Sequence, residues 1–226
     1  MTMTRIVVLI SGNGSNLAAL LAAEDAAARR TVAVLSNRDA AGLAHARRCN
    51  LPTHVVKPRR GESREDYDTR IDAALAPYDP QLIVLAGFMR ILSAGFVARH
   101  AGRLVNIHPS LLPKYRGLNV HQRVLDAGDA ESGASVHFVT SELDAGPVLI
   151  QASVPVLADD DEAALSARIH KAEHRIYPAA VELIAAGRAH AESGSIWLDD
   201  SPLTAPLQAR FDQHGVLIAW PQQLTD

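Results

Sequence analysis

Two short runs of apolar residues constrain the fold of this chain more than any other feature. Ile6 to Ile10 and Leu82 to Ala86 are apolar at every position and are bounded by polar or turn-forming residues. Successive side chains of a strand point to opposite faces, so a run without a polar face must be covered on both. The sequence therefore predicts an α/β fold, a Rossmann-like open, mostly parallel twisted sheet with helices on both faces.

Weaker patterns supply the other elements of this fold. Further strands are expected at 31–35, 53–56, 104–108, 133–139 and 147–156, the last towards a sheet edge because it contains two prolines. Helices are expected at 17–28, 42–49, from 64, at 93–100, at 119–126 and from 162. Residues 1–188 form one predicted domain. Residues 189–226 are an extension with a weak pattern, in which 195–198 and 215–220 are candidate short edge strands.

The amino-acid composition and net charge of the chain exclude several classes of binding partner. The chain has 226 residues and a formal net charge of -3, whereas a general nucleic-acid binder usually carries a basic surplus. Cys49 is the only cysteine, which excludes an internal disulfide and a Cys-rich zinc cluster. No apolar run is long enough for a signal peptide or a membrane span. We therefore expect a cytoplasmic protein with small-molecule partners, and no nucleic acid, membrane or metal.

A glycine-rich segment, Ser11-Gly-Asn-Gly-Ser-Asn16, connects the first strand to a helix. The free N–H groups at a helix start and the helix dipole favour an anion, and Gly12 and Gly14 allow a close backbone approach. Ser15 and Asn16 can cap the helix or bind phosphate oxygens. The segment lacks the ending of a P-loop and the third glycine of a dinucleotide fingerprint. A phosphate monoester site is favoured, with a dinucleotide site or a purely structural turn as alternatives.

The segment Leu104 to Gly117 begins as a strand and continues as an irregular loop. Asn106 and His108 are two residues apart, so they project to the same side of the strand. Pro109 then ends regular strand pairing. Ligands of open α/β sheets bind at the carboxyl ends of strands, where an amide and an imidazole would stand together. The alternative is that both are ordinary polar groups at a strand end.

Three further features each allow a structural and a functional interpretation. Arg64 lies in the first turn of a helix, where it is either a solvated charge or a group aimed at an anionic ligand. The segment Gly87 to Leu92 either lines a pocket for a flat ligand or closes the core over its strand. Glu173 lies beside the apolar stripe of the last long helix, as a boundary residue or as a ligand for sugar hydroxyls.

The candidate polar groups suit one type of reaction. Asp144 follows the predicted strand at 133–139 and can orient His108 and favour the imidazolium. The Asn106 amide can donate to an oxyanion, and no Ser or Cys elbow for a covalent intermediate is present. Together with a phosphate loop, these groups favour direct acyl transfer to an amine on a phosphorylated substrate.

Four motifs together resemble the folate-dependent phosphoribosylglycinamide formyltransferases. They are Ser11 to Asn16, Gly87 to Leu92, Asn106-Ile-His-Pro-Ser-Leu-Leu-Pro113 and Asp144-Ala-Gly-Pro147, within a match from about Arg5 to Gly187. The resemblance implies transfer of the formyl group of 10-formyltetrahydrofolate, as cosubstrate, to the amine of glycinamide ribonucleotide in purine biosynthesis. It also implies a phosphate-binding N-terminal half and a folate-binding and catalytic C-terminal half.

The resemblance assigns roles to individual residues. Asn106, His108 and Asp144 would form the catalytic trio. The ribonucleotide would be bound by Gly14, Ser15, Asn16, Pro109 and Glu173, and the folate by Arg64, Met89, Arg90, Ile91, Leu92, Asn106, Thr140 and Asp144. No metal is implied, and a monomer or weak homodimer is expected.

Other interpretations of the same motifs remain. Methionyl-tRNA formyltransferase and formyltetrahydrofolate hydrolase share the trio but carry additional domains, for which this sequence is expected to leave no room. A catalytically inert folate- or nucleotide-binding protein would have the same fold. The Leu112-Pro113 bond is a candidate for the cis isomer, and the extension beyond the Trp197 strand matches nothing in the family.

Overall fold

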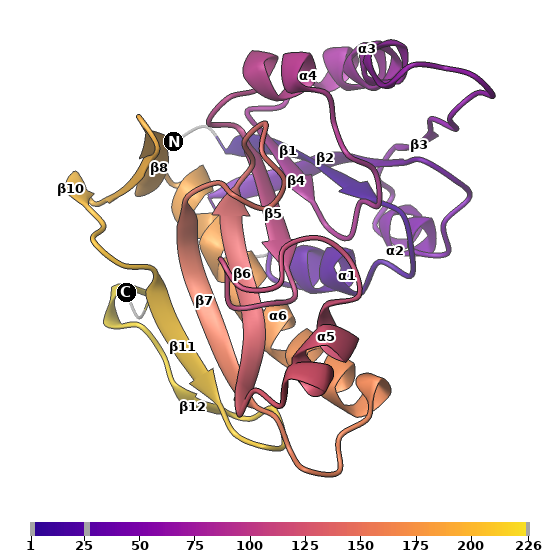
Figure 1. Cartoon of the computed structure of the whole chain (residues 1–226). Coiled ribbons are helices and arrows are strands. Elements are labelled where there is room, and N and C mark those ends of the chain that lie inside the picture. The colour runs from indigo at the N-terminus through magenta and orange to yellow at the C-terminus, as the bar shows by residue number, and fades with distance from the viewer. Residues whose placement is uncertain (1–2, 25–27, 225–226) are drawn as a thin grey trace.

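The structure, a computed structural model, describes residues 3–24 and 28–224. Its centre is a nine-stranded sheet in the order β12-β11-β7-β6-β5-β4-β1-β2-β3 (Figure 1). The first five strands of the chain pair with one another in parallel. They are β1 (Thr4–Ile10), β2 (Arg29–Ser36), β3 (Thr53–Val55), β4 (Leu82–Leu85) and β5 (Leu104–His108). The predicted open, mostly parallel α/β sheet is therefore confirmed.

The second half of the sheet is mixed. β6 (Glu131–Phe138) is antiparallel to both β5 and β7 (Val148–Pro155). β7 was expected near a sheet edge and this expectation is wrong, because β11 (Leu207–Phe211) pairs with it in parallel and β12 (Leu217–Ala219) then forms the edge. Pro147 precedes β7 and Pro155 is its last residue, so neither proline interrupts the paired positions Ile150 to Ser153.

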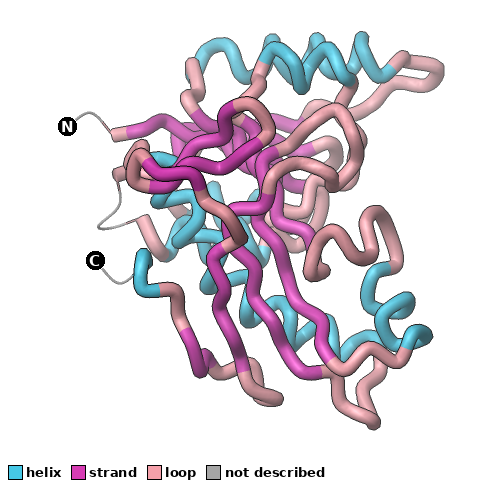
Figure 2. Tube along the Cα trace, turned by 60° about the vertical axis from the view of Figure 1, so that its left-hand side comes forward, coloured by secondary structure: helices cyan, strands magenta, loops and turns pink. Residues whose placement is uncertain are grey.

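Helices cover both faces of the sheet, as Figures 1 and 2 show. One face packs against α1 (Ser15–Ala22), α2 (Leu43–Arg48), α5 (Val120–Ala127) and α6 (Glu162–Ala185). The other packs against α3 (Arg64–Leu75), which continues into η1 (Ala76–Tyr78), and α4 (Ala94–Arg99). The run Ile6 to Ile10 divides between the two cores, since Ile6, Val8 and Ile10 face α1 and α6 while Val7 and Leu9 face α3 and α4.

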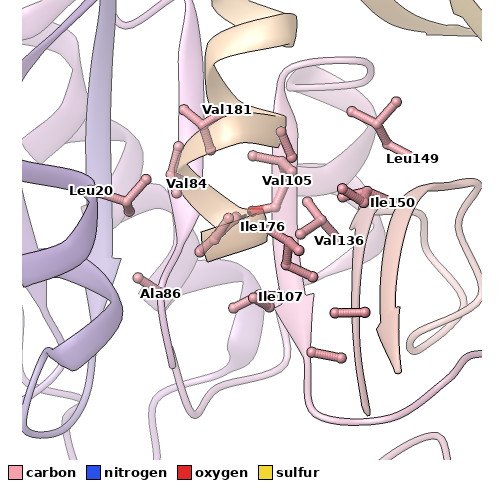
Figure 3. Close-up of a cluster of buried hydrophobic side chains, with 14 of the residues drawn as sticks. Leu20, Val84, Ala86, Val105, Ile107, Val136, Leu149, Ile150, Ile176 and Val181 are labelled. Carbon is pink, nitrogen blue, oxygen red and sulfur yellow. Dashed lines mark hydrogen bonds between the residues drawn. The ribbon is translucent and has the colours of Figure 1, made fainter. Parts of the chain in front are cut away.

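The larger core lies between α6 and strands β4 to β7. Figure 3 shows Ile176 and Val181 of α6 among Val84, Val105, Val136 and Ile150 of the sheet, all of them buried. α6 was predicted from the same apolar stripe, and it runs through Pro178 without ending there. Burying this many side chains at about 1.5–3 kcal/mol each fixes the strands whose carboxyl ends carry the candidate catalytic groups.

The C-terminal extension joins the same fold. β8 (Ala189–Glu192), β9 (Ser195–Leu198) and β10 (Ser201–Pro202) form a small antiparallel sheet, and β11 and β12 are followed by η2 (Gln222–Leu224). Leu207, Ala209 and Phe211 of β11 are buried in the larger core. Of the two strands proposed from the sequence, β9 lies in the middle of the small sheet and β12 at the edge of the large one.

Candidate active site

The loop after β5 brings the polar groups of the site together. Asn106 and His108 lie at the carboxyl end of β5, on the face opposite Val105 and Ile107. The Leu112-Pro113 bond that follows, a candidate for the cis isomer, is cis. Asp144 belongs to the turn between β6 and β7 and has a left-handed backbone conformation, with φ 49°. β6 is antiparallel to β5 and ends beside the start of β5, so it is the turn after β6 that brings Asp144 to His108 and unites the three predicted catalytic residues.

His108 is buried and held between two oxygen atoms. Its Nε2 lies 2.9 Å from the carbonyl oxygen of Tyr115, so Nε2 carries a proton and donates it there. Its Nδ1 lies 3.5 Å from Oδ2 of Asp144. The same Oδ2 accepts a hydrogen bond of 2.9 Å from the backbone N–H of Gly117. The ring is thus oriented from both sides, and the carboxylate can stabilise a positive charge on it.

Asn106 is oriented by a second histidine, His137 of β6, which is directly opposite it in the strand register. Nδ1 of His137 donates to the carbonyl of Phe138 at 3.0 Å, so Nε2 is free to accept from Nδ2 of Asn106 at 3.2 Å. Burial lowers the pKa of His137, although the hydrogen bond to Phe138 and the charge of Asp144 oppose the shift. A neutral His137 thus uses one amide hydrogen of Asn106 and leaves the other for a ligand.

The glycine-rich loop is in close contact with the start of α2. Gly14 has φ 72° and forms the N-cap of α1 without a side-chain cap. A Cβ atom built on Gly42 would lie 2.8 Å from Cα of Gly14 and 2.9 Å from the carbonyl oxygen of Gly12. The first N–H groups of α1, at Ser15 to Leu17, have no partner within the helix and suit an anion.

Ser11, at the start of this loop, also binds the loop after β4. Its N–H donates to the carbonyl of Gly87 at 3.1 Å, and its Oγ accepts from the N–H of Met89 at 2.8 Å. The carbonyl of Ser11 accepts from Nε of Arg38. Ser11 therefore connects the loop proposed for the phosphate to the loop proposed for the folate by two hydrogen bonds.

Asn16 and Glu173 meet beneath the glycine-rich loop. Nδ2 of Asn16 donates to Oε2 of Glu173 at 2.8 Å, and both residues are buried. Burial raises the pKa of Glu173, and this hydrogen bond opposes the shift. Oδ1 of Asn16 has no hydrogen-bond partner among the described residues. Glu173 is thus not a boundary residue but a buried carboxylate beside the predicted phosphate site, 157 residues away from Asn16 in the chain.

The segment Gly87 to Leu92 closes the core with some of its side chains and exposes others. Leu92 and Phe88 are buried in the smaller core, whereas Met89 and Ile91 are 63% and 53% exposed. Arg90 stacks on the ring of Tyr67, with Cζ 4.2 Å from its centroid. Oδ2 of Asp68 accepts from the N–H of Ser93 at 2.6 Å, which joins the segment to α3.

Arg64 and Thr140 complete the predicted folate residues. Arg64 is exposed in the first turn of α3, one turn before Tyr67. Thr140 is exposed in the turn before Asp144, and its Oγ1 donates to the carbonyl of Glu142 at 3.2 Å. Pro109, half-buried, directly follows His108. Among the described residues, none of these three side chains forms a hydrogen bond or ion pair with the trio, so their ligand roles stay predictions.

Comparison with known proteins decides the family. The sequence profile described as formyl transferase matches residues 4–181. Phosphoribosylglycinamide formyltransferase of Escherichia coli (strain K12) is 51% identical over 201 residues, which are 88% of this chain and 95% of that protein. The chain belongs to the formyl transferase family.

Other relatives of this formyltransferase support the same family assignment. The trifunctional purine biosynthetic protein adenosine-3 of Homo sapiens is 43% identical over 87% of this chain, which corresponds to 20% of that longer protein. The structure of phosphoribosylglycinamide formyltransferase from Coxiella burnetii aligns with a TM-score of 0.85 and 47% identity, covering 89% of this chain and 96% of that one. The resemblance inferred from the four motifs is confirmed.

Sequence reasoning missed several groups of this formyltransferase site. His137, the Tyr115 carbonyl and the Gly117 N–H all contact the predicted trio. His137 is detectable in principle, because an antiparallel neighbour of β5 must place one of its alternating residues beside Asn106. The two backbone groups belong to an irregular loop that carries no periodic signal.

No group of three or more His, Cys, Asp or Glu side chains in residues 3–24 and 28–224 is arranged to hold a metal ion. Within the same residues, no helix is long and apolar enough to cross a membrane.

Proposed function

We propose that this formyltransferase transfers the formyl group of 10-formyltetrahydrofolate to the amine of 5'-phosphoribosylglycinamide. The products are formylglycinamide ribonucleotide and tetrahydrofolate, in purine biosynthesis. The observation that carries the proposal is the convergence of Asn106, His108 and Asp144, with His108 Nδ1 3.5 Å from the Asp144 carboxylate, in a chain 51% identical to an enzyme named for this reaction.

The first step creates negative charge next to two donors. The lone pair of the amine attacks the formyl carbon, and the electrons of its C=O bond move to oxygen. The free hydrogen of the Asn106 amide and the protonated ring of His108 stabilise that oxyanion. A preorganised donor of this kind contributes roughly 10²–10³ in rate.

The second step breaks the bond between the formyl carbon and N10 of the folate. The attacking nitrogen loses one proton and N10 gains one, so the exchange is balanced without a covalent enzyme intermediate. His108 carries the proton directly or through water. Because Nε2 donates to the Tyr115 carbonyl in the free protein, that hydrogen bond has to be replaced by one to the substrate during turnover.

The remaining candidate residues bind the two substrates. Gly14, Ser15 and Asn16 bind the phosphate at the start of α1, Glu173 binds ribose hydroxyls, and Pro109 adjoins the glycinamide. Arg64, Thr140 and the segment from Met89 to Leu92 bind the folate, with Arg64 directed at its carboxylates. The uncapped helix start and the two exposed apolar side chains of the segment support these assignments. We expect the enzyme to act as a monomer or weak homodimer in the cytoplasm.

A formyl-transfer assay tests the proposal. Purified protein is mixed with 10-formyltetrahydrofolate and glycinamide ribonucleotide, and tetrahydrofolate is measured against a reaction without the ribonucleotide. Formation of tetrahydrofolate only when both substrates are present supports the proposal. Hydrolysis of the folate without the ribonucleotide, or no reaction at all, contradicts it.

A further inference from the structure

A row of polar side chains crosses the sheet from the catalytic strand to the C-terminal extension. His108 of β5 is paired with Ser135 of β6, and Ser135 is paired with Gln151 of β7. Gln151 is in turn paired with Gln208 of β11. Residues directly opposite each other on neighbouring strands project to the same face, so the four form one row. Their sequence neighbours, such as Val136 and Ile150 in Figure 3, project to the other face and pack near α6.

The middle of this row binds the turn that follows His108. Oγ of Ser135 donates to the carbonyl of Ser110 at 2.7 Å and accepts from the N–H of Leu112 at 3.0 Å. Nε2 of Gln151 donates to the carbonyl of Leu112 at 2.8 Å and to Oγ of Ser135 at 3.0 Å. A hydroxyl has one hydrogen and two lone pairs, so Ser135 is saturated, and both amide hydrogens of Gln151 are used.

The row exists because a turn, not a helix, covers this part of the sheet. A buried turn carries backbone N–H and C=O groups that need partners, which apolar side chains cannot provide. Ser135 is fully buried and Gln151 is 9% exposed, so water does not readily replace either. At the outer end, Nε2 of Gln208 donates to Oε1 of Gln151 at 3.2 Å and connects β11 to the network.

The turn carries the group that orients the His108 ring. Oγ of Ser110 donates to the carbonyl of Lys114 at 2.6 Å, which closes the turn just before Tyr115. Tyr115 has φ 56°, a conformation that the surrounding contacts must hold, and its carbonyl accepts from Nε2 of His108. Hydrogen bonds thus run from Gln151 and Ser135 through the turn to the imidazole.

We propose that Ser135 and Gln151 are positioning residues for the reaction. They fix the turn from Ser110 to Tyr115, and through it the orientation of the His108 ring and the nitrogen that carries its proton. This inference rests on the proposed role of His108, but the side chains of Ser135 and Gln151 form their hydrogen bonds with the turn, with each other and with Gln208, not with the side chains of the trio.

The test compares two serines of the same strand. Ser132 of β6 is buried, as Ser135 is, but its Oγ has no hydrogen-bond partner among the described residues. Ser135→Ala and Ser132→Ala therefore remove the same buried oxygen atom, with and without its hydrogen bonds. We expect Ser135→Ala to lower kcat at least tenfold with both KM values within threefold, and Ser132→Ala to change kcat less than twofold. Gln151→Leu is expected to behave as Ser135→Ala.

A second readout separates positioning from general destabilisation. Correlation of the ring nitrogens and protons of His108 by NMR, assigned with His108→Asn, reports which nitrogen is protonated in the free enzyme. The wild type and Ser132→Ala should show a hydrogen-bonded Nε2–H, and Ser135→Ala should show a shifted or exchange-averaged signal. An unchanged His108 signal in Ser135→Ala overturns the proposal, whether or not kcat falls, and so does an unchanged kcat.

The two proposals fail in different ways. If the wild-type enzyme forms no tetrahydrofolate, the proposed function is wrong, while the NMR comparison still decides whether Ser135 orients His108. If Gln151→Leu does not fold, Ser135→Ala, which removes one atom, decides the outcome alone.

Discussion

At the scale of single residues, His108 is the group on which the proposed mechanism depends most. His108→Asn is expected to lower kcat by at least about 10² while both substrate Kd values stay within a few-fold, because the change removes an acid–base and oxyanion group but little binding surface. Single-turnover kinetics with separate binding titrations make the measurement. A variant with normal kcat and weakened binding would make His108 a binding residue and invalidate the mechanism.

Glu173 combines a proposed role in ribose binding with a cost in stability. Its pKa is raised by burial, so the folded state disfavours the carboxylate. That penalty is absent below the pKa of the unfolded chain and grows as the pH rises towards the folded-state pKa. Glu173→Gln retains an oxygen that accepts from Asn16 but cannot ionise.

The variant is therefore expected to have a higher Tm than the wild type near neutral pH, with the difference vanishing below about pH 4. Its KM for the ribonucleotide should rise at least about tenfold, because a hydrogen bond to a charged group contributes about 1.5–3 kcal/mol. Thermal melts at several pH values and steady-state kinetics check both. A lower Tm for Glu173→Gln at neutral pH would refute the electrostatic account.

Much of the residue-level site was predictable because it follows from strand periodicity. Asn106 and His108 share a face through their spacing of two. The position of Asp144 does not follow in this way, because β6 is antiparallel to β5 and ends beside the start of β5, so Asp144 reaches His108 through the fold of the turn after β6. His137 and Ser135 were not identified because their proximity depends on the antiparallel register of β6, which the sequence of either strand does not specify. The Tyr115 carbonyl is a backbone group, and any residue type would supply it.

At the scale of elements, the contact between the glycine-rich loop and α2 leaves the least space for a larger side chain. Gly42 has φ -59°, so alanine causes no backbone strain there, but its Cβ would lie 2.8 Å from Cα of Gly14. Gly42→Ala is expected to cost about 1–3 kcal/mol through overpacking. It should also raise the KM of the ribonucleotide more than the KM of the folate.

The matched control is Gly95→Ala in α4, where the new Cβ would meet only the end of the Arg99 side chain at 3.4 Å. Urea denaturation and steady-state kinetics of both variants make the comparison. Equal effects of Gly42→Ala on both KM values would show that the loop does not belong to the ribonucleotide alone. Gly42 could not be predicted from the sequence, since the contact joins two turns 28 positions apart, a spacing without a motif.

β1 and β4 were predictable because the runs Ile6 to Ile10 and Leu82 to Ala86 are apolar on both faces. β7 was assigned to an edge on account of its prolines, yet a proline at a strand terminus leaves the interior pairing intact. β11 was missed because its pattern, with Leu207, Ala209 and Phe211 buried and Gln208 and Arg210 exposed, spans only five residues.

At the scale of the whole molecule, the C-terminal extension is expected to unfold together with the sheet. Phe211 is 3% exposed and packs into the larger core, so Phe211→Ala should cost about 3–5 kcal/mol. Ile218→Ala, at a position 60% exposed on β12, should stay within about 0.5 kcal/mol of the wild type. Urea unfolding followed by fluorescence and circular dichroism measures both. A separate early transition in Phe211→Ala, with the main transition unmoved, would mean that the extension folds independently.

The two hydrogen bonds of Ser11 to the loop after β4 have a consequence for the affinities of the two substrates. Ser11 joins the loop proposed to bind the phosphate to the loop proposed to bind the folate, so ordering either loop restricts the other. We expect heterotropic cooperativity: each substrate should tighten the binding of its partner, and by linkage the factor must be the same in both directions. Calorimetric titration of a non-reactive folate analogue, with and without ribonucleotide, gives this factor, and Ser11→Ala should bring it towards one.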